Sequence, residues 1–245
     1  MIPLKIINVI RGFQMLAVPR VPPVVKRTFP HDPQAFTQGL AYREGMLYES
    51  TGLLNASSLR RVDPASGTIL ESVSVPDVFA EGIAFLDSRI YQLTWKDRRV
   101  FVYDLQPLRR VGEGRIDHAG WGLASDGFSL LASDGSSLLR RYDGTLSVTA
   151  RIRAKLSGLR FCHLNDIEVG NGRLYANVWR TPFVAEIDLD RGAVTRIMDC
   201  AELMKVEYRD DRNAIMNGIA YNPDKGTFFV TGKRWRHYYE IRFQE

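Results

Sequence analysis

The chain has 245 residues, and a hydrophobic content of 45% is enough to bury the core of one large all-β domain or of two ordinary domains, which excludes disorder as its main state. Aromatic residues make up 11%, and 20 glycines and 11 prolines supply turns, a balance that favours many short strands. The net charge is +5, but the arginine pairs recur separately, which favours solvated strand edges and argues against nucleic acid as a partner.

Residues 1–23 are expected to be an N-terminal extension or a degraded secretory signal, ahead of a single domain over residues 24–245. Arg11 interrupts their apolar run and leaves it shorter than the core of an ordinary signal peptide. The run is also too short to span a bilayer, so we predict no stable membrane insertion. Cys162 and Cys200 are the two cysteines of the chain, and the sequence leaves open whether they form one disulfide or two buried thiols.

Five similar short segments recur along the chain. They read QGLA, EGIA, WGLA, NDIE and NGIA, and they begin at Gln38, Glu81, Trp121, Asn165 and Asn217. Their first positions are 43, 40, 44 and 52 residues apart. A period of this size indicates a propeller or a solenoid.

Each segment begins a predicted unit of up to four strands. A second run with alternating apolar residues follows at Met46–Ser50, Arg89–Trp95, Ser129–Ser133, Arg173–Trp179 and Thr227–Lys233. A third run lies at Leu59–Asp63, Val100–Asp104, Leu139–Asp143, Val184–Asp188 and Tyr238–Phe243, and the aspartate that ends the first four predicts a turn. A fourth run is visible at Thr68–Val75, Arg109–Ile116 and Ala193–Met198, and more weakly at Thr145–Ile152.

These runs predict an all-β, five-bladed β-propeller with four antiparallel strands per blade. The last repeat has three strands, and its missing outer strand is expected to be Val24–Phe29 from the other end of the chain. Pairing the two ends in this way closes the ring and removes exposed edges. The alternative, an open solenoid, needs capping units, and the sequence contains none that we recognise.

The innermost strand of a blade lines the central axis, so the first residues of the five segments should converge at one end of the channel. This ring consists of Gln38, Glu81, Trp121, Asn165 and Asn217. Four polar groups and one indole are more than a structural core needs. An alternative is that the amides only satisfy backbone groups or water.

A second layer of residues is predicted beside the ring, at the ends of the second strands. Its members are Gly52, Trp95, Gly135, Trp179 and Lys233, and Phe36 can reach the same mouth. Such a pocket, mainly aromatic with one carboxylate and one ammonium, suits a small amine-bearing group. Apolar neighbours should raise the proton affinity of Glu81 and suit it to acid/base chemistry. Several converging ligands would be needed for a hydrolytic metal site, and the four histidines lack ligand spacing.

Ten motifs between about Thr28 and Phe243 resemble the plant-type and bacterial glutaminyl-peptide cyclotransferases. They are FTQGL (Phe36–Leu40), ESTG (Glu49–Gly52), AEGIA (Ala80–Ala84), YQLTWK (Tyr91–Lys96), GWGL (Gly120–Leu123), SDGS (Ser133–Ser136), LNDIE (Leu164–Glu168), NVW (Asn177–Trp179), NGIAYN (Asn217–Asn222) and TGKRW (Thr231–Trp235). Asp166 stands where this family usually has Glu. The sequence also lacks the clear secretory signal of many members, so the periplasmic or secreted location that the resemblance implies is an expectation without support from the N-terminus.

The resemblance implies a five-bladed propeller that converts the N-terminal glutamine of peptides or proteins into pyroglutamate and releases ammonia. We also expect the protein to be a monomer. Glu81 would be the general acid/base residue. Lys233, Asn165 and Gln38 would hold the substrate or the developing oxyanion. Phe36, Trp95, Trp121 and Trp179 would wall the pocket. No cofactor is implied for catalysis, and a calcium ion in the channel, if present, would be structural.

Two other functions stay open at this point. A calcium-dependent propeller lactonase could use Glu81, Asn165 and Asn217 as ligands, although such enzymes resemble six-bladed propellers. A propeller without catalytic activity could bind peptides or sugars in the same funnel, because a fold alone does not fix a function.

Overall fold

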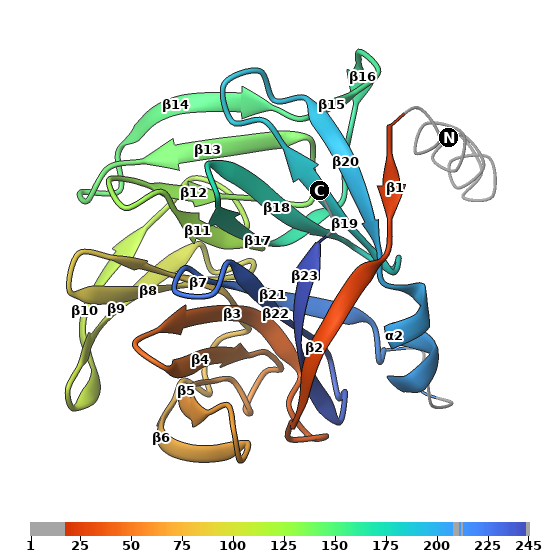
Figure 1. Ribbon diagram of the computed structural model, residues 1–245. Coiled ribbons are helices and arrows are strands. Elements are labelled where there is room, and N and C mark those ends of the chain that lie inside the picture. Colours follow the sequence, from red (N-terminus) through yellow and green to blue (C-terminus); the bar gives the residue numbers. More distant parts are fainter. Residues whose placement is uncertain (1–17, 208–210, 212, 244–245) are drawn as a thin grey trace.

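Five four-stranded antiparallel sheets surround a central axis (Figure 1) in the computed structural model, which describes residues 18–207, 211 and 213–243. Blade 1 consists of β3 (Thr37–Arg43), β4 (Met46–Thr51), β5 (Ser58–Asp63) and β6 (Thr68–Ser74), and blade 2 of β7 (Ala80–Leu86), β8 (Arg89–Thr94), β9 (Arg99–Leu105) and β10 (Leu108–Arg115). Blade 3 consists of β11 (Leu123–Ser125), β12 (Leu130–Ala132), β13 (Leu138–Tyr142) and β14 (Val148–Arg153). The predicted five-bladed propeller is therefore confirmed.

Blades 4 and 5 contain strands from both ends of the chain. Blade 4 consists of β17 (Leu164–Gly170), β18 (Arg173–Val178), β19 (Phe183–Ile187) and β20 (Val194–Asp199), and β1 (Arg20–Val21) adds a parallel edge strand to it. Blade 5 consists of β21 (Met216–Asn222), β22 (Thr227–Gly232), β23 (His237–Phe243) and β2 (Pro23–Pro30), which closes the ring as predicted. Residues 1–17 of the predicted extension over residues 1–23 lie outside the described residues. Of its other residues, Arg20–Val21 form β1 and Pro23 begins β2.

Apolar side chains fill the space between neighbouring blades. The buried residues form five clusters, one at each interface between blades. Each cluster contains the apolar residue that stands two positions after a ring residue, namely Leu40, Ile83, Leu123, Ile167 and Ile219. The close approach of the inner strands requires glycine: a Cβ on Gly82 would lie 2.4 Å from the Leu123 nitrogen, and one on Gly122 would lie 2.1 Å from the Asn165 carbonyl oxygen.

A β-bulge accompanies the ring residue in four of the five inner strands. The pairing register shifts at Gln38 in β3, at Glu81 in β7, at Asn165 in β17 and at Asn217 in β21. A bulge leaves the extra residue out of the ladder and redirects its side chain. The ring residues are thereby released from the in-and-out alternation of their strands.

Some elements differ from the prediction in ways that local hydrogen bonds explain. β14 begins at Val148, later than predicted, because the Asp143 carboxylate accepts the amide hydrogens of Thr145 and Ser147 at 2.9 and 3.0 Å and holds a turn there. The short hairpin of β15 (Lys155–Leu156) and β16 (Leu159–Arg160) and the helix α2 (Ala201–Glu207) were not predicted. Cys162 and Cys200 are both free thiols. Within residues 18–207, 211 and 213–243, we find no helix with the length and apolarity of a membrane span.

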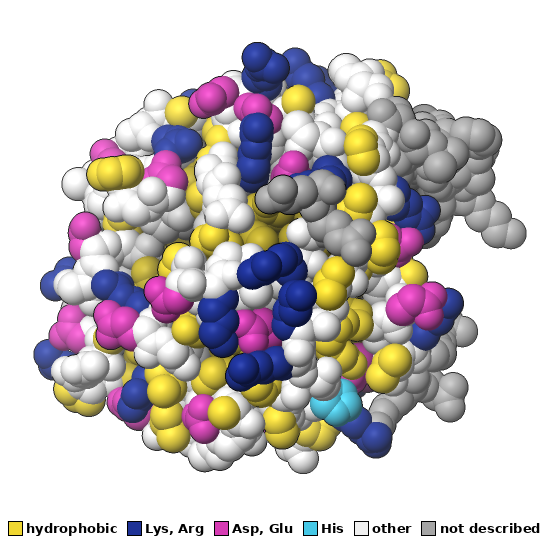
Figure 2. All heavy atoms as spheres, viewed as in Figure 1, with side chains coloured by type: hydrophobic (Ala, Val, Ile, Leu, Met, Phe, Trp, Pro, Cys, Tyr) yellow, Lys and Arg dark blue, Asp and Glu magenta, His cyan; other side chains and the backbone are white. Residues whose placement is uncertain are grey.

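The arginine pairs form ion pairs on the blades. Arg61 contacts Glu71 at 2.6 Å, Arg99 contacts Glu113 at 2.6 Å and Arg140 contacts Asp134 at 2.7 Å. On the face that Figure 2 shows, basic side chains are interspersed with acidic ones, and a group of them near the centre surrounds acidic side chains. This pairing explains why clustered arginines do not give that face an unbroken basic tract.

Candidate active site

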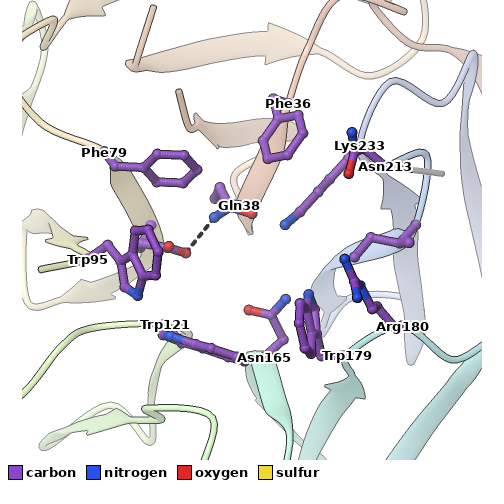
Figure 3. A pocket seen from close by; sticks show the side chains of 12 residues that line it. Phe36, Gln38, Phe79, Trp95, Trp121, Asn165, Trp179, Arg180, Asn213 and Lys233 are labelled. Carbon is purple, nitrogen blue, oxygen red and sulfur yellow. Dashed lines mark hydrogen bonds between the residues drawn. The ribbon is translucent and has the colours of Figure 1, made fainter. Parts of the chain in front are cut away.

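All eight residues that the sequence singled out as a site line one cavity at the end of the channel (Figure 3). They are Phe36, Gln38, Glu81, Trp95, Trp121, Asn165, Trp179 and Lys233. The inner strands supply Gln38, Glu81 and Asn165, whereas the tryptophans and Lys233 come from the ends of the strands or the adjoining turns. The fifth ring residue, Asn217, does not line the cavity, although its position in the repeat predicted that it would lie with the other four.

Glu81 is the buried carboxyl of the cavity. Its Oε2 accepts a hydrogen bond of 2.7 Å from Gln38 Nε2, and the residue is only 4% exposed. Burial raises the pKa of Glu81 well above its usual value, while the positive charge of Lys233 and the hydrogen bond from Gln38 act in the opposite direction. A carboxyl group whose pKa is raised in this way holds a proton more readily and can both accept and return one.

Asn217 forms hydrogen bonds that connect the inner strands of three blades. Its Nδ2 donates to the Thr37 carbonyl oxygen at 3.1 Å and approaches Gln38 Oε1 at 3.5 Å, and its Oδ1 accepts the Asp166 amide hydrogen at 3.4 Å. Asn217 thus contacts the oxygen of the Gln38 carboxamide, whereas Glu81 contacts its nitrogen. Asn217 therefore helps to orient Gln38, and its side chain is occupied by these contacts outside the cavity lining.

Lys233 provides a buried ammonium group in the same cavity. It lies at the end of β22, is 6% exposed, and its Nζ is 4.7 Å from the centre of the Phe36 ring. Burial lowers the pKa of Lys233 to about 8, although the charge of Glu81 partly opposes this effect. Figure 3 shows the Lys233 amine directed toward the centre of the pocket, where a substrate oxygen could accept a hydrogen bond from it.

Aromatic rings form the walls, and glycines make room for them. The Trp121 and Trp179 rings meet edge to face with centroids 5.7 Å apart, and the Phe79 and Trp95 rings do the same at 5.7 Å. A Cβ on Gly135 would lie 2.7 Å from the Trp121 ring. A Cβ on Gly52 would lie 2.6 Å from the Phe79 ring. The second layer thus alternates large side chains with glycines that accommodate the rings of neighbouring blades.

The cavity also contains four residues that the sequence analysis missed: Phe79, Arg180, Asn213 and Ile215. A signal existed for two of them, because Phe79 and Ile215 stand two residues before Glu81 and Asn217, as Phe36 stands before Gln38. Arg180 follows Trp179 at the position that Arg234 occupies after Lys233. Asn213 comes from a loop outside the repeat, so no periodic signal could have identified it.

Asp166 is a second buried carboxyl, below the cavity. Its Oδ2 accepts the amide hydrogens of Leu40 and Ile219 at 3.2 and 3.0 Å, and its Oδ1 has no hydrogen-bond partner among the described residues. Burial raises the pKa of Asp166 well above its usual value despite these backbone hydrogen bonds. Calcium takes six to eight oxygen ligands, and one unpaired carboxylate oxygen falls far short of that set. Over the described part of the chain, no group of three or more acidic, histidine or cysteine side chains fits a metal ion.

The arrangement can bind a small neutral group between aromatic rings, exchange a proton with it through one carboxyl, and stabilise a negative oxygen through one ammonium. Burial of both ionisable groups strengthens these interactions, because the surroundings screen charge poorly. The lining offers no serine or cysteine nucleophile. This chemistry fits a reaction within a single bound molecule.

Three comparisons with known proteins identify the family and agree with the fold. The sequence profile of the glutamine cyclotransferase family matches residues 2–243. The glutaminyl-peptide cyclotransferase of Arabidopsis thaliana is 38% identical over 224 residues, which cover 89% of this chain and 70% of that protein. The crystal structure of glutaminyl cyclase from Myxococcus xanthus superimposes with a TM-score of 0.88 at 33% identity and covers 93% of this chain and 98% of that one.

A more distant likeness concerns the architecture alone. The WD40 β-propeller domain of Doa1 matches with a TM-score of 0.51 at 11% identity, covering 84% of this chain and 63% of that one. The family is identified by the profile and by the two relatives with higher identity. The chain belongs to the glutamine cyclotransferase family.

Proposed function

We propose that the protein is a glutaminyl-peptide cyclotransferase, which converts the N-terminal glutamine of peptides or proteins into pyroglutamate and releases ammonia. The observation that carries this proposal is the pairing of a buried carboxyl, Glu81, with a buried ammonium, Lys233, in one aromatic pocket. Membership in the family supports it.

The proposed reaction is an intramolecular aminolysis. The neutral α-amine nitrogen forms a bond to the side-chain amide carbon of the same glutamine, and the bond from that carbon to the amide nitrogen breaks. The aromatic walls would hold the side chain folded back, which is the main requirement of a step within one molecule. A positive charge from Lys233 near the amine would disfavour its protonated form and keep it nucleophilic.

Glu81 is the proposed carrier of the proton in this scheme. Its carboxylate would take a proton from the attacking amine, and the resulting acid would give a proton to the departing ammonia. Burial brings the pKa of Glu81 closer to the pKa of a peptide α-amine, which is about 8. A smaller difference between the two pKa values lowers the free-energy cost of the less favourable proton transfer. Gln38 would act as a positioning residue for this carboxyl and as a substrate contact.

Lys233 and Asn165 are the proposed donors to the oxyanion that forms before the ammonia departs. Each well-placed donor of this kind contributes about 3 to 4 kcal/mol to the transition state. Phe36, Trp95, Trp121 and Trp179 would contribute walls rather than chemistry. The scheme uses no cofactor and routes no step through a metal.

The proposal is tested by incubating the protein with a Gln-initiated peptide and following the loss of ammonia by mass spectrometry. Two control peptides show whether the ammonia comes from cyclisation of an N-terminal glutamine. One begins with Asn, whose shorter side chain would have to form a strained four-membered ring. The other begins with acetylated Gln, whose amine is blocked. Turnover of the first peptide alone is expected, with and without a chelator. No turnover of any peptide would refute the assignment, and loss of activity on chelation without unfolding would favour a metal-dependent lactonase-like enzyme.

A further inference from the structure

Three basic residues occupy equivalent positions just outside the second layer of the pocket. Lys96, Arg180 and Arg234 directly follow Trp95, Trp179 and Lys233, and all three are exposed. Each lies over a ring of the pocket wall: Lys96 Nζ is 4.3 Å from the centre of Trp95, Arg180 Cζ is 4.6 Å from Trp179, and Arg234 Cζ is 5.6 Å from Phe36. We call these three residues the cationic rim.

The rim residues differ in how far their charges are compensated. Arg234 forms an ion pair of 2.6 Å with Asp211. Across the part of the chain that the structure describes, neither Lys96 nor Arg180 forms an ion pair, and Arg180 is the rim residue that also lines the cavity. Figure 3 shows Arg180 beside Trp179, on the same side of the pocket as Lys233. The guanidinium is thus stacked on an indole, and no carboxylate among the described residues pairs with its N–H groups.

A bound peptide must pass the rim when its first residue is in the pocket. The ring residues close the inner end of the cavity, because Gln38, Glu81 and Asn165 are each less than 5% exposed. The second and third residues of the substrate therefore have to leave through the mouth, past Arg180. An arginine in this position can bind a carboxylate through two parallel hydrogen bonds, whereas a cationic side chain there would meet Arg180 and Lys233 with like charge.

We infer that the cationic rim, through Arg180, makes the enzyme select Gln-initiated peptides that carry a carboxylate side chain at the second or third residue. The inference rests on the proposed function and adds a substrate class to it. It concerns residues outside the reacting centre, so Arg180 is a specificity residue and not a catalytic one. Its contribution should be electrostatic and should weaken as salt is added.

The test compares kcat/KM for C-terminally amidated peptides that differ only at the second residue, Gln-Glu, Gln-Ala and Gln-Lys. Amidation removes the terminal carboxylate, and a parallel Gln-Ala peptide with a free C-terminus measures whether that group can replace the side chain. We expect the ratio of Gln-Glu to Gln-Lys to exceed one and to fall about 5-fold in Arg180→Gln, the size of an exposed charge pair. Gln-Ala serves as the uncharged reference for each protein, so that the comparison rests on the ratio and not on the absolute rate of the variant.

Two controls separate local from general charge effects. Arg180→Lys should retain part of the preference, and Arg151→Gln, on the exposed outer strand β14, removes the same net charge and should leave the ratio unchanged. An Arg180→Gln ratio equal to that of the wild type, or an equal fall in Arg151→Gln, would overturn the inference while leaving the cyclotransferase assignment intact. Failure of the wild type to turn over any of the Gln-initiated peptides, Gln-Ala included, would overturn both the inference and the cyclotransferase assignment.

Discussion

The Gln38 carboxamide in blade 1 donates a hydrogen bond of 2.7 Å to the Glu81 carboxyl in blade 2. The two residues occupy the same position in successive repeats, so the proton affinity of one blade's ring residue is set in part by its neighbour. The hydrogen bond stabilises the ionised form of Glu81 against the effect of burial. Gln38 is thereby linked to the acid limb of the expected pH profile.

Replacing Gln38 with methionine should move that acid limb. The variant keeps a side chain of similar length but donates no hydrogen bond, so the pKa of Glu81 should rise further. The carboxylate would then form only at higher pH, and the lower limb of a kcat/KM profile should shift upward while the upper limb stays in place. A profile that falls uniformly at every pH, without a shift, would mean that Gln38 affects binding only.

Glu81→Gln should reduce turnover at least about 100-fold, the lower bound for losing a general acid/base group. The same variant should also change the pH dependence of stability. Because folding raises the pKa of Glu81 above its ordinary value of 4.5, the native state binds more protons than the unfolded state, and the wild type loses stability as pH rises above that value. The variant lacks this loss. Thermal unfolding at several pH values should therefore show that the stability of the variant increases relative to that of the wild type as pH rises. A stability difference that does not change with pH would contradict the effect of burial on the pKa of Glu81.

Lys233→Met should remove one donor to the oxyanion and, with it, the decline of kcat at high pH. The pKa of Lys233 is about 8, so its ammonium form is lost as pH rises through that value, and wild-type kcat should decline there. In the variant we expect a kcat lower by about 100-fold or more, the usual cost of one oxyanion donor, and no decline near this pH. If the variant keeps the wild-type limb, the limb belongs to another group.

Gly135→Ala should damage the pocket by displacing Trp121. The added Cβ would lie 2.7 Å from the indole ring. Gly127 is the matched control, since it has a similar positive φ (90° against 79°) but no atom within 4 Å of an added Cβ. Both variants should lose about 1 kcal/mol of stability from backbone strain, whereas only Gly135→Ala should raise KM, by about 10-fold. Equal KM values in both would separate Trp121 from substrate binding.

The sequence was sufficient for the ring and the blades because both depend on a strict repeat. Gln38, Glu81 and Asn165 occupy the same position in their repeats, and this position predicted that they lie at one end of the channel. Comparison of the repeats could also have identified Phe79, two residues before Glu81. The clustering of these residues is established, while the roles of the individual side chains remain predictions.

Features outside the repeat were harder to predict. Asn213 reaches the cavity from an irregular loop, and β1 joins blade 4 as a two-residue parallel strand too short to leave a periodic signal. Register also could not distinguish Asn217 from Asn165. The difference arises from hydrogen bonds to Thr37 and Asp166, which lie far from Asn217 in the sequence.

The pairing of β2 with β23 has a consequence for how the chain is made. Pro23 lies opposite Phe243, so the outer strand of blade 5 is synthesised before blades 1 to 4 and its partner strand after them. Blades 1 to 3 can assemble on the nascent chain from strands that are close in sequence, but β2 must wait, unpaired, for most of translation. Its Lys26 and Arg27, both exposed, and its two prolines, Pro23 and Pro30, are residues that discourage a lone strand from joining another nascent chain during that wait.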